Sequence, residues 1–90
     1  MIGELMHGTL IGPGQPPRTR QMSKVHIARA LWRLGDGASF YMRNSHLTAT
    51  LQPNGSLRWV MAEANTRRLG YAGDIDLGET EVLIDMEMGQ

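Results

Sequence analysis

The chain has 90 residues, contains no cysteine and carries a formal net charge of zero at pH 7. This length predicts one domain that buries a modest core without disulfides, and the missing cysteines exclude thiol chemistry. No apolar run approaches the roughly 20 residues of a membrane helix, and the N-terminus lacks the pattern of a signal peptide, so we expect a cytoplasmic protein.

The first 20 residues combine a weak strand pattern with a loop. Residues 9–11 are suited to a short strand. Residues 12–20 are rich in proline and glycine, which predicts a loop or arm. Residues 13–18 also match the P-x-x-P-x-R pattern that SH3-type domains bind, but such a short pattern is common and a plain loop is favoured.

Residues 23–34 have the clearest helical pattern. Ser23 is a suitable N-cap, and Gly35 is a suitable residue to end the helix. The apolar positions form one stripe (Ile27, Leu31 and Leu34, widened by Val25, Ala28 and Trp32). We therefore expect this helix to pack on the apolar face of a sheet, with Trp32 next to Trp59 in the core.

Residues 38–62 predict a three-stranded antiparallel meander. Its second turn has two alternatives. A two-residue turn at Asn54 and Gly55 would place Leu51 opposite Arg58, whereas a three-residue loop with left-handed Gly55 places Leu51 opposite Leu57. Because strand side chains alternate between faces, only the longer loop gathers the apolar residues on one face, so we expect that loop.

The first turn of the meander is predicted as a tight turn at Asn44-Ser45, which pairs Arg43 with His46 and Met42 with Leu47. With both turns in place, the apolar side chains lie on one sheet face (Ala38, Phe40, Met42, Leu47, Ala49, Leu51, Leu57, Trp59 and Met61). The opposite face is mostly polar (Ser39, Tyr41, Arg43, His46, Thr48, Thr50, Arg58 and Val60).

The C-terminal third has weaker patterns. Residues 63–70 suit a connection or one helical turn, and residues 71–78 a short strand with Ile75 and Leu77 pointing inward. Residues 81–88 alternate as a strand whose acidic row suits a sheet edge. The whole pattern predicts one α+β domain over residues 1–90. In it, one amphipathic helix at about 23–34 packs on an antiparallel sheet of four to five strands built around the meander.

No catalytic or metal-binding motif is present. The sequence lacks a P-loop, a dinucleotide-binding glycine pattern, G-x-S-x-G and H-E-x-x-H, and its three histidines lack the spacing of metal ligands. The acidic residues 74–81 do not follow the EF-hand pattern. We therefore expect a protein that is not an enzyme and that uses no cofactor, metal ion or small-molecule substrate.

The distribution of charge is the main functional signal. All nine Lys and Arg residues lie within 18–68, whereas residues 69–90 carry only acidic charges. This predicts a binding module whose partner is another protein or a second copy of the chain. The candidate contact residues lie on the polar sheet face and on the basic helix face (Tyr41, Arg43, His46 and Arg58; His26, Arg29 and Arg33).

Nucleic acid is the alternative partner, because the arginine-rich segment 18–68 could neutralise phosphates. The near-neutral isoelectric point of about 6.8 counts against this alternative. The small size and the missing catalytic motifs would also suit an accessory protein of a phage or mobile element.

Overall fold

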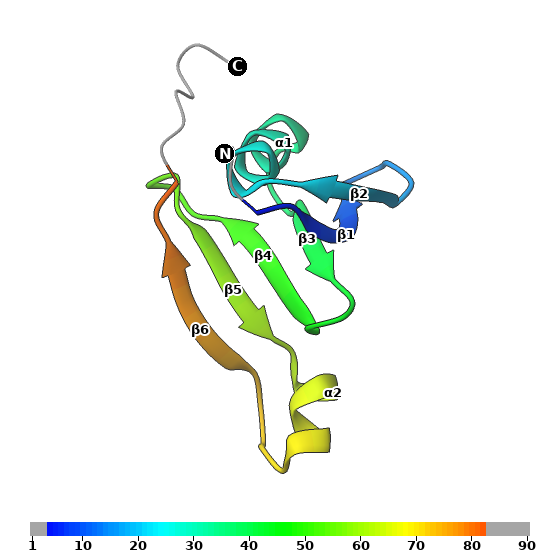
Figure 1. The fold of residues 1–90 in the computed structure, drawn as a ribbon, viewed down its shortest axis with the longest axis vertical. Helices are drawn as coiled ribbons and strands as arrows, with labels where there is room; N and C mark the ends of the chain where they lie inside the picture. The colour runs from blue at the N-terminus through cyan, green and yellow to red at the C-terminus, as the bar shows by residue number, and fades with distance from the viewer. Residues whose placement is uncertain (1–3, 83–90) are drawn as a thin grey trace.

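The predicted meander is the centre of a larger antiparallel sheet in the computed structural model, which describes residues 4–82. The sheet has six strands in the order β2-β1-β3-β4-β5-β6, and α1 covers one of its faces (Figure 1). The elements in chain order are β1 (Met6–Ile11), β2 (Arg18–Met22), α1 (Lys24–Leu34), β3 (Ser39–Met42), β4 (Leu47–Leu51), β5 (Leu57–Met61), α2 (Glu63–Thr66), the 3-10 helix η1 (Arg67–Leu69) and β6 (Ile75–Thr80).

The α+β class is confirmed, but the predicted strand count of four to five is too low. The difference lies in the N-terminal segment, where β1 and β2 form an antiparallel hairpin. Residues 18–20, which the sequence placed in a Pro/Gly-rich arm, are the start of β2. Arg18 pairs with Leu10 and Arg20 with Gly8. A strand without apolar alternation gives no period-2 signal, so this hairpin was missed.

The predicted register of the meander is confirmed. Leu51 lies opposite Leu57, and Ala49 lies between Phe40 and Trp59 on the neighbouring strands. The loop between β4 and β5 is closed by a hydrogen bond of 2.8 Å from the Gln52 amide to the Ser56 carbonyl.

Gly55 has the left-handed backbone (φ 89°) that the three-residue loop requires. Asn54 stabilises this loop because its Oδ1 accepts a hydrogen bond of 3.0 Å from the Ser56 amide.

The first turn of the meander differs from the prediction. Met42 pairs with Leu47 as expected, but residues 43–46 together form the turn, and the left-handed residue is His46 (φ 60°) rather than Asn44. A longer turn avoids placing Ser45 in the left-handed region, which it tolerates poorly. Arg43 and His46 are therefore turn residues and do not form a ladder pair on the sheet face.

Helix α1 begins and ends where the sequence predicted. The Ser23 hydroxyl accepts a hydrogen bond from the His26 amide, and the Gly35 amide donates to the Leu31 carbonyl. One face of α1 packs on the sheet and completes the core, whose buried apolar residues are Met6, Ile27, Ala28, Leu31, Ala38, Phe40, Ala49, Leu57, Trp59 and Val82.

Trp32 is not part of this core. Its side chain is 38% exposed whereas Trp59 is 9% exposed, so the expected pairing of the two tryptophans is wrong. Trp32 lies about 100° around the helix axis from Leu31, at the border of the apolar stripe, where the sheet no longer covers it.

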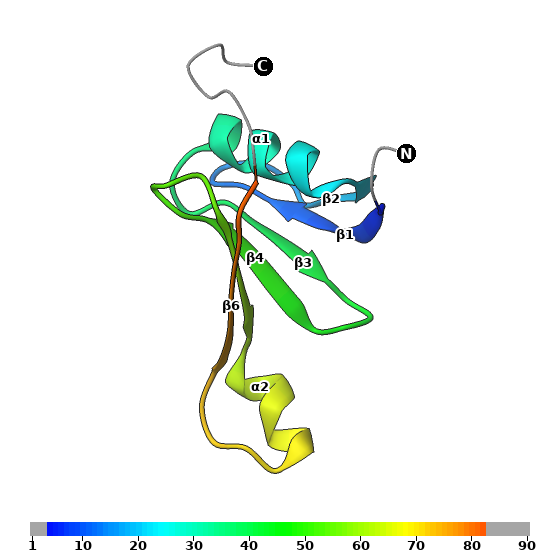
Figure 2. The ribbon, with the colours of Figure 1, turned by 60° about the vertical axis from the view of Figure 1, so that its left-hand side comes forward.

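The connection between β5 and β6 extends to the end of the molecule opposite α1 (Figure 2). It contains α2 and η1, so the prediction of a single helix is too low; the sequence had left residues 63–70 open between a connection and one helical turn. Leu77 was expected to point inward but is 55% exposed, because the β5–β6 pairing shifts register between Arg58 and Val60, beside left-handed Gly78. The strand predicted over residues 81–88 falls almost entirely outside the described residues. No helix within residues 4–82 is long and apolar enough to span a bilayer.

Candidate docking surface

The sheet face opposite α1 does not bring its predicted contact residues into one group. Tyr41 is half-buried on β3, and its hydroxyl lies 3.4 Å from Nδ1 of His46. Arg43 is exposed in the same turn as His46. Arg58 lies on β5 opposite Thr50, so it belongs to another part of the face. Of the predicted contact residues on this face, Tyr41, Arg43 and His46 therefore lie together at the β3–β4 turn, and Arg58 does not.

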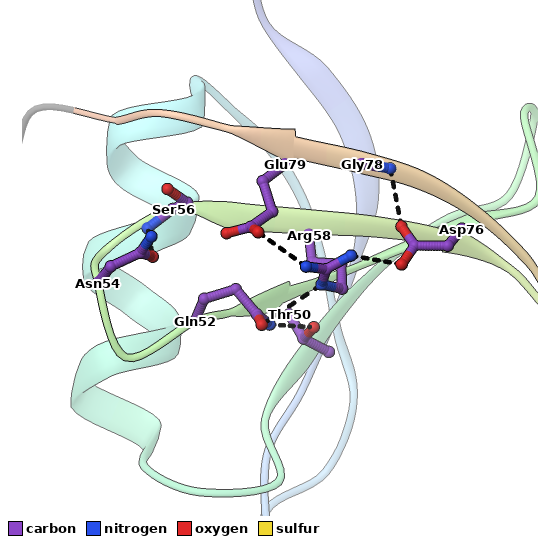
Figure 3. Close-up of polar contacts among 8 residues, drawn as sticks. All are labelled: Thr50, Gln52, Asn54, Ser56, Arg58, Asp76, Gly78 and Glu79. Atoms are coloured by element: carbon purple, nitrogen blue, oxygen red, sulfur yellow. Dashed lines mark hydrogen bonds and ion pairs between the residues drawn. The ribbon is translucent and has the colours of Figure 1, made fainter.

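Arg58 is held in place by residues of β6 and of the β4–β5 loop (Figure 3). Its Nη1 donates to Asp76, its Nη2 donates to Glu79 at 2.7 Å, and its Nε donates to Oε1 of Gln52 at 3.4 Å. Since the side chain is only 32% exposed and its fork is occupied by carboxylates, Arg58 stabilises the β5–β6 pairing. It is poorly placed to bind an external partner.

The charged residues of α1 and β2 are all basic (Arg18, Arg20, Lys24, Arg29 and Arg33). On α1, His26 is exposed in the first turn, where its Nδ1 lies 3.1 Å from the Ser23 hydroxyl. Arg29 is half-buried, and its buried Nε has no hydrogen-bond partner. Arg33 is exposed in the last turn. The helix and the adjacent edge strand therefore form one positively charged side of the molecule.

The edge strand β2 has a partner on one side only. It is the first strand of the sheet order, so in residues 4–82 no strand pairs with its outer edge, and Arg18 to Gln21 are exposed. Directly opposed residues of paired strands share a face. Arg18 therefore projects to the same face as its partner Leu10, and Arg20 to the same face as its partner Gly8. This face is the one that α1 covers.

A groove of about 390 Å³ lies between β2 and α1, and we call it the basic groove. Arg18, Arg20 and Arg33 line it together with apolar side chains, and no acidic residue is among its lining residues. The full lining consists of Leu10, Gly12, Gln15, Pro16, Arg18, Arg20, Met22, Ala30, Arg33 and Leu34. Of the helix residues predicted for partner binding, only Arg33 takes part.

Arg18 and Arg20 are the functional candidates that the sequence reasoning did not select as site residues. The sequence did place them on a basic arm, but it did not indicate an exposed strand edge beside a helix. The only signal that could have found the edge is the spacing, because a Pro/Gly-rich segment between residues 9–11 and Met22 suits a hairpin.

The described residues offer no sign of a metal site, since no three His, Asp or Glu side chains cluster among residues 4–82. Comparison of the chain with family models, with curated proteins and with solved structures gave no match.

Proposed function

We propose that this protein is a non-enzymatic binding module that docks an acidic protein partner on β2 and the basic groove. One observation carries the proposal. Arg18 and Arg20 lie on an unpaired strand edge beside apolar side chains, and in the described part of the chain no carboxylate lies within ion-pair distance of either residue. Their charge is therefore left for an external group to neutralise.

The geometry suits an extended segment of the partner. An open strand edge presents backbone amides and carbonyls that pair with an added strand. The two arginines beside that edge suit carboxylates, because a guanidinium group donates two parallel hydrogen bonds to one carboxylate. The positive side formed by β2 and α1 would also steer an acidic partner toward the groove. On the sheet face opposite α1, Tyr41, Arg43 and His46 are the predicted contact residues that would add to the binding.

Peptide binding tests this proposal. A labelled peptide of alternating valine and glutamate should bind the protein at low salt, whereas the matching valine–lysine peptide should not. The double variant Arg18→Glu/Arg20→Glu should weaken binding of the acidic peptide by about tenfold or more, because it replaces attraction with repulsion. Fluorescence anisotropy measures the affinity, and amide NMR shifts should locate the contact on β2.

The matched control is Arg67→Glu/Arg68→Glu, which makes the same change of charge in η1, at the far end of the molecule (Figure 1). When both variants are compared at 0.1 M salt, this control should retain the affinity to within about threefold, because exposed charges farther apart than about 10 Å are then largely screened. Equal affinity of the acidic peptide for the chain and for the β2 variant would refute the proposal.

Nucleic acid is the second candidate, favoured by the purely basic charge of β2 and α1. Arginine forks bind phosphates as well as carboxylates. A phosphate contact predicts retention of a mixed oligonucleotide pool at low salt and a steep loss of affinity as salt rises. If the pool is not retained at low salt, the nucleic-acid function is excluded.

A further inference from the structure

We propose that the partner of β2 is a second copy of this chain, which supplies its residues 83–87. This inference rests on the proposed function and names the acidic partner. The observation behind it is a match between the exposed edge strand and a segment of the chain's own sequence.

The match is one of residue type at alternate positions. Read from its C-terminal end, β2 presents Met22, Arg20 and Arg18 on the face of the basic groove. The segment 83–87 carries one apolar and two acidic residues at the same spacing (Leu83, Asp85 and Glu87). At every second position, β2 therefore has an apolar residue and then two cations, and the segment has an apolar residue and then two anions.

Antiparallel pairing joins these residues one to one. Leu83 would lie opposite Met22, Asp85 opposite Arg20 and Glu87 opposite Arg18. Directly opposed side chains share a sheet face, so all three pairs would lie on the groove side. A slip of one residue would move the two carboxylates to the other face and leave both arginines without partners. The two ion pairs together with the Leu83–Met22 pair therefore select one antiparallel register.

The same segment of the same chain is a poor candidate for this site. The last described residues follow β6, which lies at the opposite edge of the sheet from β2, with four strands between them. Val82, the last described residue, is buried in the core together with Met6. Leu83 follows it directly, so pairing Leu83 with the exposed outer edge of β2 in the same chain would draw Val82 out of the core.

Such a contact is heterologous, because β2 of one copy meets residues 83–87 of the next. Heterologous contacts close into rings or extend as open chains rather than forming a simple two-fold dimer. We therefore expect association that increases with concentration and weakens with added salt.

A charge swap on the full-length chain tests the inference. Arg18→Glu/Arg20→Glu and Asp85→Lys/Glu87→Lys should each abolish the association seen by multi-angle light scattering over a concentration series. An equimolar mixture of the two variants should associate again, because each supplies the charge that the other needs. The quadruple variant should also associate. Circular dichroism verifies that each variant is folded, and Arg67→Glu/Arg68→Glu serves as the charge-matched control.

The outcomes separate this inference from the function on which it rests. A wild-type chain that stays monomeric at every concentration overturns the second-copy partner, and the proposed function still stands if the acidic peptide binds β2. Association that survives either double variant, or that the mixture and the quadruple variant do not restore, also overturns the inference. If the acidic peptide does not bind either, both proposals fail.

Discussion

Arg58 shows how the surroundings of a residue decide its role. By composition, an arginine on a polar sheet face resembles a contact residue for a partner. In the structure, Asp76 and Glu79 of β6 occupy its guanidinium group, and Gln52 accepts from its Nε. The same residue type on β2, which has no carboxylate within ion-pair distance among residues 4–82, is the stronger candidate for recognition.

Replacing Arg58 with lysine should destabilise the fold even though the charge is kept. Lysine cannot donate to two carboxylates through a planar fork, so we expect a loss of about 1 kcal/mol in the free energy of unfolding, a size typical of a partly exposed ion-pair network. Urea denaturation measures it. Arg67→Lys is the control, because Glu63 is the one carboxylate that pairs with Arg67 among residues 4–82 and the Arg67 side chain is 72% exposed. Equal effects of the two variants would contradict the structural role of Arg58.

Gly8 is required by close packing in β1. A Cβ atom at this position would lie 2.5 Å from the Tyr41 carbonyl oxygen and 2.6 Å from Cζ of Phe40, which is fully buried. We expect Gly8→Ala to lower the free energy of unfolding by about 1–3 kcal/mol, as overpacking of a core does. Thermal and urea denaturation test this. An unchanged transition midpoint would show that β1 or the Phe40 ring moves aside at little cost.

At the scale of elements, two turns of the meander illustrate how far local patterns predict structure. The β4–β5 turn was predicted in detail, because Pro53-Asn54-Gly55 and the apolar alternation favour the same loop. For the β3–β4 turn the alternation predicted the pair Met42–Leu47, but Asn44-Ser45 is a weak turn signal, and the loop is longer than expected.

The conformation of Gly55 gives a prediction for the β4–β5 hairpin. A Cβ atom at this position would have nothing within 4 Å, so strain in the left-handed backbone is the main cost of a substitution. Gly55→Ala should therefore destabilise the protein by about 1 kcal/mol, whereas Gly55→Asn should cost less because asparagine tolerates this conformation. Chemical denaturation compares the two variants. If alanine costs no more than asparagine, backbone strain is not the cause.

At the scale of the whole molecule, the core and the charges are unevenly placed. The buried cluster joins α1 to the strands and includes no residue of the connection 62–74. The basic side of the molecule is formed by β2 and α1, while the carboxylates of Asp76 and Glu79 lie on β6 at the other edge of the sheet.

The position of the core predicts where the fold opens first. Amides of α2 and η1 should exchange with solvent through local opening. We expect their free energy of opening to be lower than that of the β3, β4 and β5 amides by about 2 kcal/mol or more. Hydrogen exchange followed by NMR measures both groups. Uniform protection across the molecule would show that the connection unfolds only together with the core. Thr66 is buried in this connection, and its hydroxyl donates to the Gly73 carbonyl at 2.6 Å, so it should be among the slower residues there.

The sequence by itself determined the helix, the meander and its register, because these depend on alternation and on turn residues within about 25 neighbouring positions. It also indicated an arginine-rich segment, but it did not separate the arginines that are neutralised from those that are not. The tertiary structure decided this point. It brings Asp76 and Glu79 to Arg58 across a separation of about 20 residues, and it leaves Arg18 and Arg20 on an edge that no described strand covers. Strand neighbours that are distant in sequence therefore define the candidate docking surface, because the energy of a charge depends on what lies beside it in space.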